Sequence, residues 1–434
     1  MNVFILGVPH KGSSSLLASP YMEKELRLLG ITPTVMAVND EAQLTAAIRQ
    51  IVMLGGLVLT PLTGKANIDR LLSDSMAKAC GLPLEQNEEV FEQLAQRNVK
   101  LTREEVAQLS TLPKGAQVYA FHDDGYPAYQ VDGENIHAIL LPADPAEQSA
   151  VFLNTVFPTF AQQPKYPCAS HTIRVMELSA AEVEGALKDA LITENPCIAV
   201  YSGKEETIVR VSVRAQAQEQ AASACQSAAK TVLERLGSYV YGVDVPNIER
   251  ALLQRLEKKQ LHLALAESGS KRRGEQRLVK CKKADSVELY FPQENSPAVE
   301  AAKAQYGAVS LQTACAMAAS GSASNRIGVA VVMPTARERA ASAYVAACFS
   351  GHTLSRVIPI SGFKDVQQLS DACVSHGLNL ARKFADSHPT LPKGAVAAIA
   401  APAAIPKEET TSMPSEEKQS LPKGRVYIDS KILL

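Results

Sequence analysis

The 434-residue sequence has no excess of charge of either sign and no long apolar run. It holds 44 Lys and Arg against 45 Asp and Glu, a net charge of −1, so no global field would gather nucleic acid or acidic lipid. The apolar start at residues 3–6 has no basic residue before it. This start predicts a first β-strand, and neither a signal peptide nor a membrane span.

Cysteine and histidine are present, but neither is grouped in the way that metals or disulfide frameworks require. The eight cysteines form no CxxC pair, and the eight histidines form no HxxxH or HExxH motif. These absences argue against a zinc finger, a secreted disulfide framework and a metal site built on histidine. We therefore expect buried cysteines in a reducing compartment, which predicts a cytoplasmic protein.

The length and the order of the expected elements indicate several domains. Residues 1–160 alternate strand and helix patterns with short connections, which predicts an α/β domain with a parallel sheet. Residues 166–245 give a strand, a helix, a hairpin and a long alanine-rich helix, typical of a small α+β module. Residues 246–387 return to α/β, and residues 388–434 have the Ala, Pro, Glu and Ser composition of a low-complexity linker and tail.

Short motifs along most of the chain resemble those of one family. They are LVLT at 57–60 with Gly64 and Asp69, LPKGA at 112–116, LPADPAE at 141–147, Asn195-Pro196 with RLGSYVYG at 235–242, ALAES at 264–268, and GAVS at 307–310 with Met317-Ala318. In this order they resemble the CinA family of competence/damage-inducible proteins over residues 1–387. The resemblance implies a MogA/MoaB-like three-layer domain of molybdopterin-binding type, a KH-like α+β connector, an amidase-type C-terminal α/β domain with a flexible tail, and a homodimer.

The N-terminal domain lacks most of the site residues that its resemblance implies. Family members cleave the pyrophosphate of ADP-ribose there, which needs donors for phosphate and carboxylates for a divalent metal. Here no Asp or Glu follows the first strand before Glu23, and Ile68 replaces one of two paired aspartates. We expect a Gly/Ser loop on a structural domain, with a nucleotide or phosphate ligand and then metal-dependent hydrolysis as the alternatives, because one carboxylate holds a divalent metal poorly. The candidate ligand-binding residues are Lys11, Gly12, Ser13, Ser14, Gly64, Lys65 and Asp69.

The C-terminal domain keeps the serine of the resemblance. Family members hydrolyse nicotinamide mononucleotide to its acid with a serine in an AESCTGG turn, where a helix N-terminus stabilises the oxyanion. Residues 266–272 read AESGSKR here, so the candidate catalytic residues are Ser268 as nucleophile, Glu267 beside it, and Tyr290 in the family's tyrosine place. No lysine follows Tyr290 at the matching spacing, and the family's glycine-containing substrate loop is replaced at 333–339.

The base that would activate Ser268 stays open at this point. Ser268 and Lys271 have the SxxK spacing, which places two side chains on one face of a helix. Lys282 and Lys283 are alternative candidates. Residues 271–283 as a solvated basic loop form the remaining interpretation.

The sequence thus supports two classes of function. The first is a hydrolase of the nicotinamide-nucleotide amidase type, with reduced or altered activity, and one variant of it has shifted specificity through the basic residues 271–273. The second is a non-catalytic nucleotide-binding or scaffolding protein that keeps the CinA fold. We expect no nucleic-acid partner, because the GxxG loop with which KH domains clamp RNA is missing, and no membrane partner.

Overall fold

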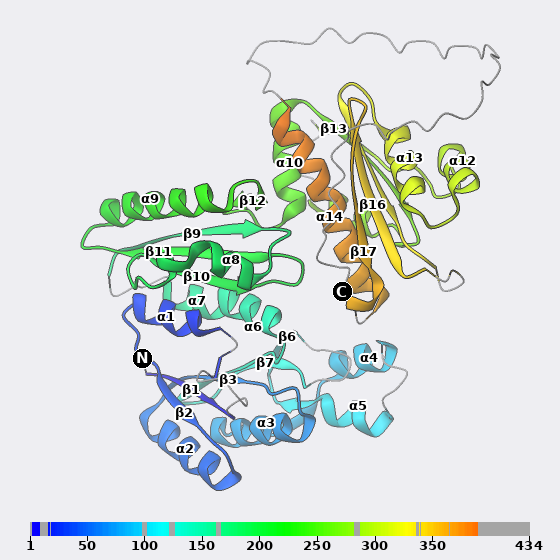
Figure 1. Ribbon diagram of the computed structural model, residues 1–434. Coiled ribbons are helices and arrows are strands. Elements are labelled where there is room, and N and C mark those ends of the chain that lie inside the picture. Colours follow the sequence, from blue (N-terminus) through cyan, green and yellow to red (C-terminus); the bar gives the residue numbers. More distant parts are fainter. Residues whose placement is uncertain are drawn as a thin grey trace, which may run out of the picture. The chain divides into compact units, whose positions relative to one another are not determined.

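The computed structural model describes residues 2–8, 16–17, 19–97, 102–120, 126–161, 166–281, 287–335, 338, 340–363 and 365–388. It divides into two compact units, Met1–Asp244 and Val245–Leu434. The described part of the chain holds no helix with the length and apolar character needed to cross a membrane. The predicted α/β class is confirmed, with strands and helices alternating through both units (Figure 1).

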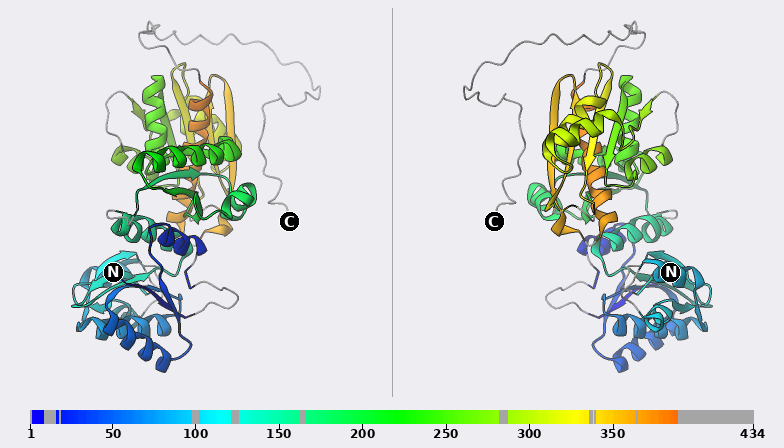
Figure 2. Two further views of the ribbon diagram at one scale, coloured as in Figure 1. Left: turned by 90° about the vertical axis from the view of Figure 1, so that its left-hand side faces the viewer. Right: turned by 90° about the vertical axis from the view of Figure 1, so that its right-hand side faces the viewer.

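The first sheet of the first unit has the order β2-β1-β3-β8-β7-β6. Its first four strands are parallel and its last two antiparallel. Helices lie over both of its faces, which makes the three-layer arrangement that the sequence predicts (Figures 1 and 2). The strands are β1 (Val3–Gly7), β2 (Thr34–Ala37), β3 (Gly56–Pro61), β6 (Gln117–Ala120), β7 (Ala128–Asp132) and β8 (Ile136–Leu141), and a separate pair is β4 (Leu84–Gln86) with β5 (Thr111–Pro113).

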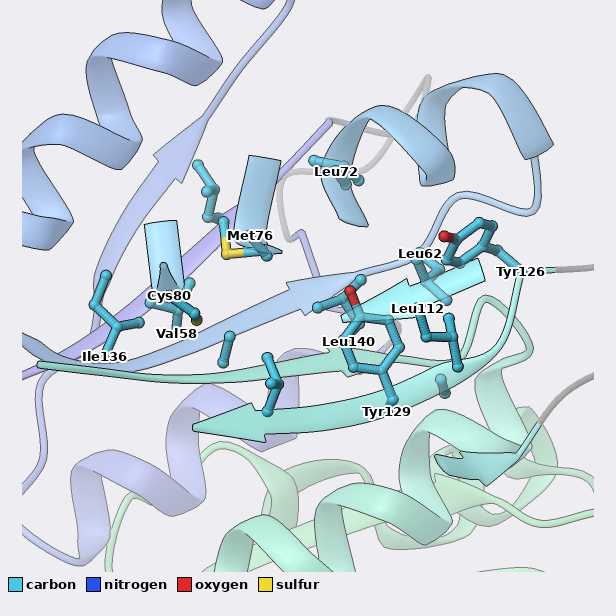
Figure 3. Close-up of a cluster of buried hydrophobic side chains, with 14 of the residues drawn as sticks. Val58, Leu62, Leu72, Met76, Cys80, Leu112, Tyr126, Tyr129, Ile136 and Leu140 are labelled. Carbon is cyan, nitrogen blue, oxygen red and sulfur yellow. The ribbon is translucent and has the colours of Figure 1, made fainter. Parts of the chain in front are cut away.

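Alternating side chains of these strands fill two cores. Phe4 and Leu6 point into one core, whereas Val3 and Ile5 point into the other, as the two-residue period of a strand requires. Figure 3 shows the first core, between the sheet and the helices that cover this face. Those helices are α2 (Glu41–Leu54), α3 (Ala66–Cys80), α4 (Glu88–Arg97) and α5 (Arg103–Leu109). The second core lies on the other face of the sheet and is closed by α1 (Pro20–Leu28), α6 (Pro145–Val151) and α7 (Phe157–Ala161), with a π-helical turn at Phe152–Val156.

The second sheet of this unit is antiparallel, in the order β10-β11-β9-β12. Its strands are β9 (Cys168–Val175), β10 (Cys197–Ser202), β11 (Thr207–Arg214) and β12 (Val240–Val243). Helices α8 (Ala180–Leu187) and α9 (Gln218–Leu236) cover one face, where Val209 and Val211 are buried. On the other face, Tyr201 and Ile208 join the core that includes residues of α1 and α7. The sheet is therefore covered on both faces within the first unit.

A buried ionic group lies at this second face. The Glu25 carboxylate, on α1, is fully buried and accepts hydrogen bonds from Tyr201 Oη at 2.6 Å and Ser212 Oγ at 3.1 Å. Arg210 Nε lies 2.9 Å from it as an ion pair, and the guanidinium stacks 3.7 Å from the centre of the Phe157 ring. Burial raises the pKa of the Glu25 carboxyl, and Arg210 opposes that rise.

The second unit is built on one five-stranded sheet in the order β14-β13-β15-β16-β17. Helices α10 and α14 cover one face and α12 and α13 the other (Figure 1). The strands are β13 (His262–Ser268), β14 (Leu289–Tyr290), β15 (Arg326–Val332), β16 (Ser342–Phe349) and β17 (His352–Pro359), and the helices are α10 (Ile248–Lys259), α11 (Arg273–Cys281), α12 (Pro297–Tyr306), α13 (Leu311–Gly321) and α14 (Val366–Ser387). The tail after residue 388 and Lys282 and Lys283 lie outside the described residues.

Candidate functional site

Ser268 is the last residue of β13, at the carboxyl end of a strand that lies between β14 and β15. It pairs with Val332, the last residue of the parallel strand β15. Its side chain is almost fully buried, with 5% of the residue exposed. The carboxyl ends of parallel strands are where open α/β sheets bind their ligands, so the fold places the candidate nucleophile at the edge where a site is expected.

Glu267 has its carboxylate bound within the turn that follows β13. It accepts hydrogen bonds from Ser270 Oγ at 2.6 Å, from the Gly274 amide at 2.9 Å and from the Glu275 amide at 3.0 Å. The two amides belong to the first turn of α11, where the helix has unsatisfied N–H groups. Glu267 therefore fixes the turn that follows Ser268 and occupies two of the N–H groups at the start of α11.

A carboxylate from a distant loop contacts the candidate nucleophile. Ser268 Oγ donates to Glu294 Oε1 at 2.6 Å, and Lys303 Nζ donates to the same oxygen at 3.1 Å. The backbone amide of Gly269, the next residue after Ser268, also favours the ionised form of this carboxylate and so lowers its pKa. Partial burial raises the pKa of Glu294, but the hydrogen bonds from Ser268 and Lys303 outweigh it and hold the pKa below its usual value.

The sequence analysis missed Glu294 and Lys303. The resemblance directed attention to a lysine close to Tyr290, whereas Lys303 lies 9 positions after Glu294 on α12. A usable signal was present, because Val299, Ala302 and Lys303 have the helical spacing of one face, and the first two are buried. This spacing places Lys303 on the same face of α12 as Val299 and Ala302, the face that packs against the rest of the unit.

Tyr290 does not lie with Ser268. It pairs with Ala264 in the parallel register of β13 and β14, four residues before Ser268, or about 13 Å along the strand. Its hydroxyl donates to the Glu288 carboxylate, and the Arg326 guanidinium lies 4.5 Å from the centre of its ring. The structure thus gives Tyr290 partners at the other end of the strand.

Lys271 does not share a helical face with Ser268. Ser268 ends a strand, and α11 begins only at Arg273, so the premise of the SxxK interpretation is absent. The interpretation of residues 271–283 as a loop is also wrong for most of them, because α11 occupies Arg273–Cys281. This helix is held from α14 by Asp371, which accepts two hydrogen bonds from Arg273, at 2.7 and 3.0 Å.

The turn between β13 and α11 has a strained backbone. Lys271 and Arg272 have consecutive positive φ angles of 55° and 59°, in the left-handed region that favours glycine. Gly269 precedes them with φ 79°, and a Cβ there would lie 2.3 Å from the Met333 carbonyl oxygen. The lysine and the arginine therefore hold a conformation that their side chains disfavour.

We expect Lys271→Gly and Arg272→Gly each to stabilise the second unit by about 0.5–1 kcal/mol, because relief of the left-handed strain exceeds the added entropy of the unfolded chain. Urea unfolding followed by circular dichroism measures the change. Lys280→Gly, in the regular part of α11, is the control and should destabilise by about 1 kcal/mol. A loss of stability in Lys271→Gly and Arg272→Gly would contradict the inference that the backbone of this turn is strained.

The described N-terminal candidate residues lie in the turn after β3 and in the first turn of α3. Asp69 is buried and accepts from the Thr63 amide at 2.7 Å, from Thr63 Oγ1 at 2.8 Å and from the Gly64 amide at 2.9 Å. Lys65 is exposed and precedes α3. Lys11, Gly12, Ser13 and Ser14 lie outside the described residues.

A divalent metal does not fit the described residues of this turn. Both Asp69 oxygens are occupied by donors of the turn itself, and a hard cation needs several free oxygens. Within the described ranges, the structure contains no group of three His, Cys, Asp or Glu side chains placed to hold a metal ion. Asp69 therefore serves to shape the turn.

Parts of the chain are similar to known proteins. The family model for the damage-inducible protein CinA KH domain matches residues 170–242. A protein named as a competence-damage inducible protein in Caldicellulosiruptor bescii is 28% identical over 205 residues, 46% of this chain and 50% of that protein. A CinA-like protein of Desulfovibrio desulfuricans is 28% identical over 240 residues, 54% of this chain and 56% of that protein. The chain spans about half the length of these curated relatives.

Solved structures are similar to parts of the chain. The protein CinA from Thermoplasma acidophilum is 17% identical and covers 37% of this chain and 97% of its own, with a TM-score of 0.31. A molybdopterin biosynthesis protein from Mycobacterium abscessus is 13% identical and covers 37% and 92%, with a TM-score of 0.24. The match of residues 170–242 to the CinA KH domain, with the relatives that carry the CinA name, confirms the predicted resemblance to the CinA family.

Proposed function

We propose that the second unit is a hydrolase of serine-amidase type, whose substrate is a small carboxamide, with nicotinamide mononucleotide as the first candidate. One observation carries this proposal: the hydroxyl of Ser268 and the ammonium of Lys303 donate to the same oxygen of one carboxylate group, beside the backbone amide of Gly269 that follows the strand. A carboxylate is the group that amide hydrolysis produces. Donors arranged around it can also surround the carboxamide and the oxyanion that forms from it.

The first chemical step follows from these positions. Ser268 Oγ attacks the amide carbon and forms a C–O bond, while the Gly269 amide donates to the developing oxyanion. The Ser268 proton passes to Lys303, which lies beside the hydroxyl because both contact the same Glu294 oxygen. The step requires Lys303 to act through a free amine nitrogen, so the substrate must first take the place of Glu294 beside it.

The remaining steps restore the enzyme. The C–N bond breaks, and the nitrogen leaves as ammonia with the proton that Lys303 returns to it. Water then attacks the acyl group on Ser268, a C–O bond to water forms and the bond to Ser268 Oγ breaks. One water proton returns through Lys303 to Ser268, the other passes to solvent, and the carboxylate product leaves.

We propose no hydrolysis for the N-terminal site. The one carboxylate left there, on Asp69, is occupied by the Thr63 and Gly64 donors. Pyrophosphate cleavage needs metal-bound charge at the phosphate, and Asp69 supplies none. A ligand role for the turn stays a prediction from the sequence.

The test is ammonia release from nicotinamide mononucleotide by the full chain and by Ser268→Ala. We expect the wild type to release ammonia and Ser268→Ala to fall to the background rate, because no other nucleophile occupies the end of β13. Ser320→Ala, whose hydroxyl donates to the Met317 carbonyl oxygen, is the matched control and should keep the wild-type rate. Equal release by wild type and Ser268→Ala would sink the proposal and favour the non-catalytic alternative.

A further inference from the structure

We propose that Glu294 is an intramolecular inhibitor, whose carboxylate occupies the place of the carboxylate product and must leave before a substrate binds. The inference rests on the proposed function for the nature of the reaction that is held back. The occupancy itself rests on contacts, because the Ser268 hydroxyl and the Lys303 ammonium both donate to the Glu294 carboxylate within the second unit.

The contacts of Glu294 are those of a bound carboxylate ligand. A hydroxyl and an ammonium donate to it, and hydrogen bonds to an ionised acceptor are about twice as strong as neutral ones. These donors come from the end of β13 and from α12, which are separate elements brought together by the fold. The pocket that they form would bind a free carboxylate in the same way, so Glu294 competes with any such ligand.

The position of Glu294 lets it leave. It lies between β14 and α12 in a turn that is closed by a hydrogen bond from the Ser296 amide to the Gln293 carbonyl oxygen. Its side chain is 53% exposed, whereas the Lys303 side chain is 19% exposed. Rotation of the Glu294 side chain into water would leave the donors of the site in place. The cost of opening is the loss of two hydrogen bonds, which water partly replaces.

The charge of Glu294 favours an inhibitor over a general base. A general base works best when its pKa is near the operating pH, whereas the pKa of Glu294 is held below its usual value by Ser268 and Lys303. A carboxylate so strongly stabilised in its ionised form accepts a proton poorly. It is, however, well suited to hold two donors in a closed arrangement.

Removal of the carboxylate provides the test. Glu294→Ala should bind nicotinate, used as the carboxylate probe, at least about tenfold more tightly than the wild type, because a site that is open a tenth of the time loses that factor in apparent affinity. Titration followed by NMR or calorimetry measures the binding. For turnover of nicotinamide mononucleotide, kcat/KM should rise by a similar factor.

Two further variants serve as controls. Glu300→Ala removes another acid beside Lys303, at 3.9 Å, but leaves the Ser268 contact, so its affinity for nicotinate should equal that of the wild type. Glu294→Asp keeps the charge on a shorter side chain and should lie between wild type and Glu294→Ala. Thermal unfolding of Glu294→Ala should match the wild type, since half of the side chain is already in water.

The outcomes separate the inference from the proposed function. Lower turnover with unchanged nicotinate affinity in Glu294→Ala would overturn the inference, because it would show that Glu294 is a base. Unchanged affinity and turnover would overturn it as well. Tighter nicotinate binding without ammonia release from any variant would support the inhibitor while refuting the amidase.

Discussion

Gly328→Ala is expected to destabilise the second unit by about 3 kcal/mol or more. Gly328 lies in β15 beneath α13, and a methyl group there would be 1.9 Å from the Ala318 carbonyl oxygen and 2.8 Å from the Ser322 nitrogen. These are backbone atoms, so no change of rotamer relieves the contact. The helix would have to move away from the sheet over its whole contact. Urea unfolding followed by far-ultraviolet circular dichroism measures the loss.

Gly377→Ala is the matched control for this prediction. Gly377 is a helical glycine of α14 on the same sheet, but its added methyl would meet side-chain tips, Val329 Cγ1 at 3.1 Å and Val331 Cγ2 at 3.6 Å. These can yield by a few tenths of an ångström, and alanine is favoured over glycine in a helix by about 1 kcal/mol. We expect a net change below about 1 kcal/mol. Equal effects of the two substitutions would show that α13 can move freely.

Glu25→Ala is expected to destabilise the first unit by about 3–5 kcal/mol, the usual loss when one partner of a buried ion pair is removed. The Arg210 side chain is 11% exposed and would keep its charge without the carboxylate. The Tyr201 and Ser212 hydroxyls would also lose their acceptor. Urea unfolding measures the free energy, and hydrogen exchange of the β10 and β11 amides assigns the transition to this unit.

A double variant shows whether the charge is the cause. Glu25→Met with Arg210→Met removes both charges and keeps apolar volume, and such replacements of buried pairs are often neutral or stabilising. We expect it to recover most of the stability that Glu25→Ala loses. A double variant that is as unstable as the single one would instead assign the loss to packing against Phe157.

Much of the fold could be predicted because its signals are local. Asp40 precedes a helical pattern and caps α2 by accepting from the Gln43 amide at 2.8 Å. The range 366–387 predicts a helix that the structure shows as α14, capped by Asp365. The strand β17 was missed, although Ser350 and Gly351, with φ 50° and 77°, form the two-residue turn that joins it to β16.

The candidate site could be predicted only in part, because its residues meet through tertiary contacts. The neighbouring residues of the strand identify Ser268 as a candidate site residue. Its role as nucleophile stays a prediction. No local sequence pattern around Glu294 or Lys303 indicates which residue each of them contacts, because a carboxylate in a turn and a lysine on a helix are common. The helix α11 was missed for a similar reason. Its strongest support, Asp371, is 98 positions away from Arg273, and its sequence alone is that of a charged loop.

The sheet β10-β11-β9-β12, which the CinA KH match covers, is buried on both faces. This burial has a consequence for how the chain can be divided. Separated from the preceding residues, the segment 166–244 would present Tyr201 and Ile208 to water and leave Arg210 without Glu25. The domain boundary that the sequence predicts near residue 165 therefore does not separate two independently folding parts. The two segments form one folded unit. A chain cut there would therefore stay together as a pair of associated fragments, and either fragment made alone would bind the other.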